Sequence, residues 1–188
     1  MRTKDENKTR AIKAAVIALA QQDGFTNLTT AKVAKRAGVS PATIYLNYKD
    51  KTDMLSRLYE EVKDDLHQGV AEAIAAAGDD IEAQLRAALH FSVAQTLAHP
   101  REAHFVSALW TNQELLDEAA RAYGQTTAGP LAKLFQRLNA SPDFTDAPAV
   151  IVAAVASLPT TVLQTATDPV AQATIEQTID VAVKALKR

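Results

Sequence analysis

The side chains best suited to bind another molecule are concentrated between Leu28 and Lys51, in LTTAKVAKRAGVSPATIYLNYKDK. This stretch combines hydroxyl groups with lysine and arginine, a mixture that suits hydrogen bonds and ion pairs to phosphate oxygens. Thr29 or Thr30 can cap a helix by accepting from its free backbone N–H groups, and the same hydroxyl can reach a phosphate. The stretch therefore predicts noncovalent binding of a polyanion.

Catalytic or metal chemistry has little support elsewhere in the chain. The sequence has no nucleophile elbow, glycine-rich phosphate loop, HExxH or paired-carboxylate motif, and it has no cysteine for disulfides, iron–sulfur clusters or thiolate zinc sites. His90, His99 and His104 could bind a metal with Asp or Glu, but none of their pairs has the i,i+4 spacing of one helical face. We therefore predict a protein that is not an enzyme and has no catalytic residues, no cofactor and no metal.

Two short helices joined by a tight turn must position the side chains of Leu28–Lys51. Gly38 can adopt the left-handed conformation that ends the first helix. Ser40 can cap the second helix, and Pro41 fits its first position. The first helix has one apolar face, formed by Val33, Ala34 and Ala37.

The second helix of this pair has a buried and an exposed side. Ile44 and Tyr48, four residues apart, would attach it to the rest of the domain. The residues nearer its exposed side are Ala42, Thr43, Leu46 and Asn47. This is a helix-turn-helix pattern, which places its second helix in the DNA major groove. The alternative is a helical hairpin in an ordinary bundle, but the order of glycine, cap, proline and isoleucine favours DNA binding.

The segment LTTAKVAKRAGVSPATIYLNYKDKTDML resembles the N-terminal domain of the TetR family of bacterial transcriptional regulators, over roughly the first third of the chain. The matching positions are Thr29, Thr30, Val33, Ala34, Ala37, Gly38, Val39, Ser40, Ile44, Tyr45, Tyr48, Lys51 and Leu55. Two positions depart from the family pattern. Asn47 stands where the family often has histidine or another aromatic residue, and Tyr48 stands where it usually has phenylalanine.

The resemblance implies roles for individual side chains. Tyr45 would offer its hydroxyl, and Lys51 its ammonium, to backbone phosphates. Thr43 would bond to a base edge or a phosphate, and Ala42 would touch a thymine methyl. The predicted DNA-binding residues are Thr29, Thr30, Ser40, Pro41, Ala42, Thr43, Tyr45, Asn47 and Lys51.

Helical periodicity over the remaining sequence predicts an all-α fold of about nine helices. An N-terminal three-helix helix-turn-helix domain is expected at residues 1–50, and a larger helical ligand-binding and dimerisation domain at 51–188. We expect helices from about Asp5 to Gln22, from Asp50 or Lys51 past Leu66, at 81–99 and 100–110, and over one long segment at 113–138, followed by a loop at 139–148. A bend in the long segment near Gly124 or at Gly129–Pro130 is left open.

The last two expected helices, at 147–167 and 170–186, are rich in apolar residues around much of their circumference. One face would pack on the body and the other on a partner, which predicts a homodimer through a four-helix bundle; the family resemblance implies the same. The alternative places both helices in the core of a monomer. Pro159 is expected to kink or interrupt the first of them.

Five aromatic residues of the body could line an apolar cavity or could form its packed core. The family resemblance favours a site for a small-molecule effector. The candidate ligand-binding residues are Tyr59, Phe91, Phe105, Trp110 and Tyr123.

The charge of the chain is unevenly distributed. The 188 residues carry a net charge of −2, but residues 1–51 hold ten Lys and Arg against four Asp and Glu, and the rest is acidic. A basic end on an acidic body suits polyanion binding by the first segment alone. The charged start MRTKDENKTR lacks a signal core, and no stretch is long enough for a membrane span, so we expect a cytoplasmic protein with no membrane partner.

The predicted function is a repressor that binds a palindromic double-stranded DNA operator as a homodimer and is released by a small-molecule effector. Activation, or autoregulation without a ligand, stays open at this point. The competing class is an all-helical enzyme or metal-binding protein with an incidental helix-turn-helix. A ligand-free DNA-binding structural protein is disfavoured by the long non-basic body.

Overall fold

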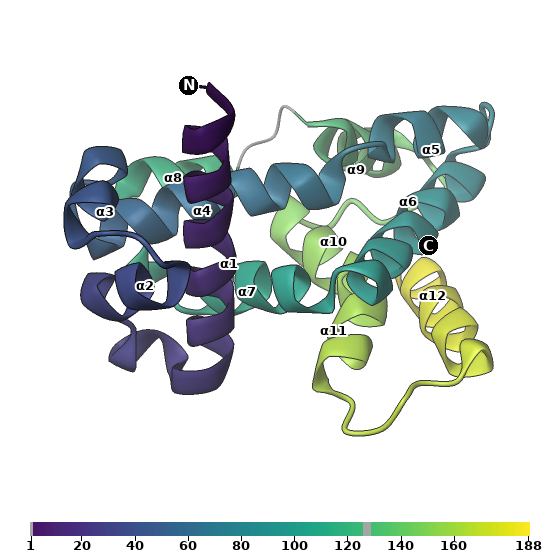
Figure 1. Cartoon of the computed structure of the whole chain (residues 1–188). Helices are drawn as coiled ribbons and strands as arrows, with labels where there is room; N and C mark the ends of the chain where they lie inside the picture. The colour runs from purple at the N-terminus through teal and green to yellow at the C-terminus, as the bar shows by residue number, and fades with distance from the viewer. Residues whose placement is uncertain (1, 126–128) are drawn as a thin grey trace. The chain divides into compact units, whose positions relative to one another are not determined.

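The computed structural model describes residues 2–125 and 129–188, and most of them are helical (Figure 1). The helices are α1 (Arg2–Asn27), α2 (Thr30–Ala37), α3 (Pro41–Asn47), α4 (Lys51–His67), α5 (Val70–Ala76), α6 (Ile81–Ala98), α7 (Pro100–Thr111), the 3-10 turn η1 (Gln113–Leu115), α8 (Glu118–Gly124), α9 (Pro130–Ala140), α10 (Ala149–Ala156), α11 (Leu158–Thr165) and α12 (Gln172–Leu186). The predicted all-α class is confirmed. None of the helices described could span a membrane, because none is both long and apolar enough.

The chain divides into two compact units. The first contains Met1–Asp64 and Arg101–Gln125, and the second contains Asp65–Pro100 and Thr126–Arg188. The first unit therefore includes α7, η1 and α8 in addition to the three N-terminal helices and most of α4. The functional boundary at residue 50 stays a prediction.

The first unit is built around α1, against which α2 packs, and α3 packs in turn on α2. Gly24 interrupts the helical dihedrals of α1 with φ 71° and ψ 166°, which glycine tolerates because it has no Cβ. The break lies close to the expected end of the first helix. The largest fully buried side chains here include Ile12, Leu28, Ile44, Met54, Leu55, Leu58, Tyr59, Phe105 and Leu109.

The second unit packs α6 against α5, α9, α11 and α12. Its core is a single cluster of apolar side chains contributed by these helices and by α10. The most deeply buried members include Leu85, Leu134, Leu138, Val152, Ile179, Val183 and Leu186. The second unit thus has an apolar core of its own.

Two expected long helices are divided in the structure. The expectation of one helix at 113–138 was wrong, because η1 ends at Leu115 and Asp117 then caps α8, its carboxylate accepting from the Ala120 N–H at 2.8 Å. The part of that expected helix at residues 126–128 lies outside the described residues. The segment expected at 147–167 is interrupted between Ala156 and Leu158, as the lack of an N–H on Pro159 predicted. These divisions make the helices more numerous than expected.

Candidate functional site

The helix-turn-helix is held in shape by its caps. The Thr29 hydroxyl accepts from the Lys32 N–H at 3.2 Å, so Thr29 is the cap of α2. Gly38 follows α2 with φ 67° and ψ 29°, the left-handed conformation expected of it. The Ser40 hydroxyl accepts from the Thr43 N–H at 3.2 Å, and Pro41 begins α3. The local sequence therefore fixes both helices and the turn between them.

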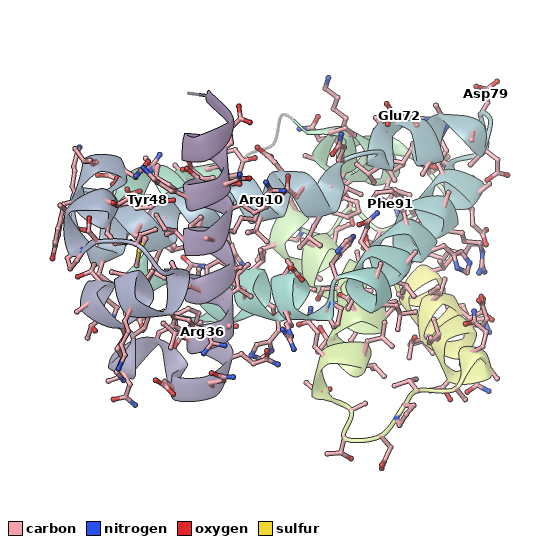
Figure 2. All side chains as sticks on the ribbon, in the orientation of Figure 1. Arg10, Arg36, Tyr48, Glu72, Asp79 and Phe91 are labelled. Atoms are coloured by element: carbon pink, nitrogen blue, oxygen red, sulfur yellow. The ribbon has the colours of Figure 1, made fainter. Side chains whose placement is uncertain are left out.

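The two faces of α3 are distinct in their burial. Ile44 and Tyr48 are buried, which attaches the helix to the first unit. Tyr48 is labelled in Figure 2, at the end of α3. Tyr45 is 59% exposed and Leu46 is 85% exposed, so both side chains project into solvent. The exposed face of α3 therefore presents a hydroxyl group and an apolar side chain to its surroundings.

Tyr45 and Thr30 lie together although they are fifteen positions apart in the sequence. Their hydroxyl oxygens are 3.1 Å apart, and either can donate to the other. Thr30 begins α2 and Tyr45 belongs to α3, so the pair links the start of α2 to α3. A phosphate oxygen at this point could accept from either hydroxyl.

Asn47 and Thr43 are connected within α3 itself. The Asn47 amide donates to the Thr43 carbonyl oxygen at 2.8 Å, and the Thr43 hydroxyl lies 3.0 Å from that of Ser40. These bonds leave further hydrogen-bonding capacity on both side chains, because an amide group has two N–H donors and one acceptor oxygen. Ala42 and Pro41 are exposed beside them.

Lys51 has a structural partner that its predicted role did not include. Its ammonium donates to the carbonyl oxygen of Phe25 at 2.6 Å, and the side chain is partly buried. Phe25 follows the Gly24 break, so this bond supports the end of α1. An ammonium has three N–H donors, and a phosphate contact by Lys51 stays a prediction.

The basic side chains of α2 are exposed beside the turn. Lys32 forms an ion pair with Asp23 at 3.2 Å, and Arg36, labelled in Figure 2, donates to the Gln22 side-chain oxygen at 2.8 Å. Lys35 is exposed on the same helix. Such exposed pairs are weak in water and can exchange for phosphate contacts at little cost.

Three of the five predicted ligand-binding residues surround one lysine, which the sequence did not single out. The Lys63 ammonium lies 5.8 Å from the ring centroid of Tyr59, 6.0 Å from that of Trp110 and 5.4 Å from that of Tyr123. Tyr59 and Trp110 are stacked, with centroids 6.4 Å apart and planes 9° apart. We call Tyr59, Trp110 and Tyr123 the aromatic cage.

Polar bonds close the aromatic cage at the end of α8. Lys63 donates to the Gly124 carbonyl oxygen at 3.1 Å, and the Tyr123 hydroxyl donates to Asp64. Burial raises the pKa of Tyr59 to about 12. Burial, together with the bond to Asp64, raises the pKa of Tyr123 to about 12, and burial lowers the pKa of Lys63. Both phenols are therefore neutral at pH 7, and the lysine has lost part of its hydration.

The other two predicted ligand-binding residues lie elsewhere. Phe105 is fully buried and its ring lies 6.0 Å from that of Phe25, at 52°. Phe91, labelled in Figure 2, belongs to α6 of the second unit and packs on the apolar core there. A role for either in ligand binding stays a prediction.

An open groove of about 730 Å³ lies in the first unit, among α1, α4 and α7. Its walls combine both signs of charge with apolar groups, and two of its lining residues, Lys13 and Glu61, form an ion pair of 3.0 Å. Its lining residues are Glu6, Thr9, Arg10, Lys13, Ala14, Ile17, Glu61 and Glu102, which include none of the five predicted aromatic residues.

The three histidines considered as metal ligands are exposed. His90 lies 3.5 Å from Glu176 in the second unit. Over the described ranges, the structure contains no group of three or more His, Cys, Asp or Glu side chains placed to hold a metal ion.

The fold and the capped helix pair define an all-helical protein with a helix-turn-helix domain of the DNA-binding type. Residues 12–58, from α1 to α4, match the profile of the bacterial regulatory proteins of the tetR family. The resemblance inferred from Leu28–Leu55 is confirmed over residues 12–58, the segment that matches the tetR-family profile.

A similar sequence occurs in the nucleoid occlusion factor SlmA of Yersinia enterocolitica, which is 36% identical over 64 residues. That alignment covers 34% of this chain and 32% of SlmA, and the same figures hold for SlmA of Sodalis glossinidius. The chain thus matches about a third of the length of these relatives.

The fold is shared along the whole chain with solved structures. A TetR family transcription regulator from Marinobacter aquaeolei VT8 has a TM-score of 0.84 at 22% identity, covering 100% of this chain and 99% of that one. A TetR-family regulator from Haemophilus influenzae has a TM-score of 0.76 at 15% identity, covering all of both chains. The fatty acid degradation regulator FadR of Bacillus halodurans has a TM-score of 0.71 at 20% identity, covering 94% of each chain.

Proposed function

We propose that the protein is a transcriptional regulator that binds double-stranded DNA through α2 and α3. The observation that carries this proposal is the exposed face of α3, where Tyr45 and Leu46 project into solvent and Tyr45 meets Thr30 at the start of the basic helix α2. An α-helix fits the major groove, and exposed hydroxyl and apolar groups match phosphate oxygens and thymine methyls. The nine DNA-binding residues predicted from the sequence belong to this proposal.

The protein would bind DNA as a homodimer formed through α10, α11 and α12. These helices pack on one another in the second unit, yet Val150 is 74% exposed, Ile151 49%, Leu158 38% and Val181 56%. Large apolar side chains of this kind favour burial against a partner, and a second copy would present the same surface. A two-fold dimer then places two α3 helices in successive major grooves, about 34–36 Å apart.

The direction of regulation is repression that a small-molecule effector relieves. The aromatic cage supports an effector site in the first unit, because it gathers three rings around a dehydrated cation next to α4. Such a ligand would release DNA if it bound more tightly to a state in which the two α3 helices no longer fit successive grooves.

DNA binding is tested by selecting sites from randomised duplexes with the purified protein and titrating the selected duplex across a salt series. We expect a palindromic site and an affinity that falls steeply with salt, as phosphate neutralisation requires. A folded protein that retains no duplex even at low salt would refute the proposal.

The dimer is tested by light scattering after size-exclusion chromatography. Val181→Glu and Val150→Glu each place a charge on the exposed apolar surface, and both should shift the protein to a monomer. Lys133→Glu changes the charge of an exposed residue on α9 and serves as the matched control. Wild-type protein that elutes as a monomer at micromolar concentration would contradict this interface.

A further inference from the structure

Lys63 occupies a position that an external cation could take. Its ammonium faces three aromatic rings at 5.4 to 6.0 Å, within the range in which a ring face attracts a cation. We infer that the aromatic cage of Tyr59, Trp110 and Tyr123 is a binding site for an alkylated ammonium ion, which enters by displacing the Lys63 ammonium. This inference rests on the proposed function, because it names the chemical class of the effector proposed there.

The chemistry of the cage favours an alkylated ammonium over a primary one. A primary ammonium has three N–H groups that need acceptors, and Gly124 supplies one carbonyl oxygen to Lys63. Burial lowers the pKa of Lys63, so the surroundings penalise its strongly hydrated cation. A quaternary ammonium has no N–H to satisfy and carries its charge on methyl groups that pack on ring faces, the arrangement of known aromatic cages.

The fourth wall of the cage is backbone, and it depends on a glycine. A Cβ atom placed on Gly124 would overlap Trp110 and lie 2.8 Å from the Tyr59 hydroxyl oxygen. Only glycine therefore lets the end of α8 approach the stacked rings so closely. The carbonyl oxygen at this position adds a partial negative charge to the cage.

Negative charge remains at the site when Lys63 leaves. Asp64 accepts from the Tyr123 hydroxyl, and the charges of Asp64 and Glu60 both contribute to the raised pKa of Tyr123. These carboxylates would offset the charge of an incoming cation. The displaced Lys63 side chain has a flexible four-carbon stem and could move its ammonium towards water.

The experiment titrates the full-length protein with choline and follows the fluorescence of Trp110, the one tryptophan of the chain. The matched probe is dimethylbutanol, the uncharged isostere of choline in which carbon replaces nitrogen. We expect a saturable change with choline and none with dimethylbutanol at the same concentrations. Equal responses to both probes, or no saturable response to choline, would overturn the inference.

Lys63→Met provides the sharper test because it removes the competing cation and keeps most of the side-chain volume. It should bind choline roughly tenfold more tightly than the wild type, whereas loss of an ordinary contact residue would weaken binding. Tyr123→Leu removes one ring and should weaken binding about fivefold. Lys133→Met, an exposed lysine on α9, is the control and should change nothing. Choline affinity that is unchanged or lower in a folded Lys63→Met protein contradicts displacement.

Because this titration contains no DNA, its failure is separable from failure of the proposed function. Choline binding that leaves operator affinity unchanged would refute the effector role while retaining the cage as a cation site. Operator binding without any choline response would refute the cage alone.

Discussion

The hydroxyl pair of Thr30 and Tyr45 makes a quantitative prediction about DNA binding. Tyr45 is 59% exposed, so replacing it with phenylalanine should leave the fold intact and remove one potential phosphate donor. A hydrogen bond to a charged acceptor contributes about 1.5 kcal/mol at the low end of its usual range, which suits an exposed site. A dimer makes this contact once in each of two half-sites, so the two contributions add. Tyr45→Phe should therefore weaken operator binding by about 3 kcal/mol, or roughly a hundredfold.

Thr30 is expected to affect DNA binding by orienting Tyr45. Its hydroxyl lies 3.1 Å from that of Tyr45, so it can hold the phenol in the direction of the phosphate. Thr30→Val should therefore weaken DNA binding in the wild-type background but cost much less once Tyr45→Phe is present. The expected coupling is about 0.5 to 1 kcal/mol for each half-site, as neighbouring hydrogen-bonded groups show.

The measurement is a double-mutant cycle by fluorescence anisotropy of a labelled operator duplex at two salt concentrations. Tyr48→Phe is the matched control, because it removes a hydroxyl from a buried tyrosine of the same segment. The reasoning is refuted if Tyr45→Phe changes affinity by less than about twofold. Strict additivity of the two substitutions would show instead that Thr30 acts on DNA independently of Tyr45.

Three further predictions concern bonds that the structure places around the helix-turn-helix and α8. Lys51→Ala should lower the melting temperature, because Lys51 donates a hydrogen bond to Phe25. If the Lys51 ammonium also contacts a phosphate, the substitution should reduce the slope of log affinity against log salt concentration by about 0.9 per half-site. An unchanged slope in salt titrations would make Lys51 purely structural. Burial alone would raise the pKa of Asp117, but the hydrogen bonds from the Ala120 N–H and from Arg57 outweigh burial and hold that pKa below its usual value. Asp117 therefore stabilises the folded state at pH values above its pKa in the unfolded chain. This stabilisation is lost as the pH falls through the pKa of Asp117 in the folded state. Asp117→Asn should flatten this acidic part of the pH–stability curve in denaturant titrations, and an unaltered curve would contradict the assignment. Gly124→Ala should destabilise the protein by about 1 to 3 kcal/mol through overlap with Trp110, measured by thermal unfolding, whereas Gly129→Ala, whose Cβ would meet open space, should not.

The helix-turn-helix was predictable from the sequence because its signals are local. Ser40 caps α3 three residues before its bonded N–H, and Gly38 sits directly after the helix that it ends. Each of these choices agrees with its neighbours, which makes short-range patterns reliable. Asp117 is a local N-cap signal of the same kind, because it directly precedes Glu118 at the start of α8. It divides the long helix that periodicity alone suggested.

The arrangement of the aromatic cage around Lys63 could not be predicted from the sequence, although all three residues of the cage were named as ligand candidates. Lys63 meets Gly124 across a separation of 61 positions, and no periodicity connects the two. Lys63 also looks like an ordinary charged residue of an amphipathic helix, and only packing gives it three aromatic neighbours. Lys51 was named from the sequence for a phosphate contact, which stays a prediction, and its bond to Phe25 depends on where the chain folds back.

α8 is bonded to α4 at both of its ends, and these bonds determine what a ligand in the aromatic cage would change. At its start, Arg57 forms an ion pair with Asp117 at 2.7 Å, and at its end Lys63 bonds to Gly124. A cation that displaces Lys63 would remove the bond to Gly124 and leave the Arg57–Asp117 ion pair in place. A tenfold loss of operator affinity requires about 1.4 kcal/mol of differential binding, which lies within the range of one dehydrated cation–π contact. Because the incoming cation would replace Lys63 on the same three rings, only the difference in binding free energy between the two cations is available to supply this amount.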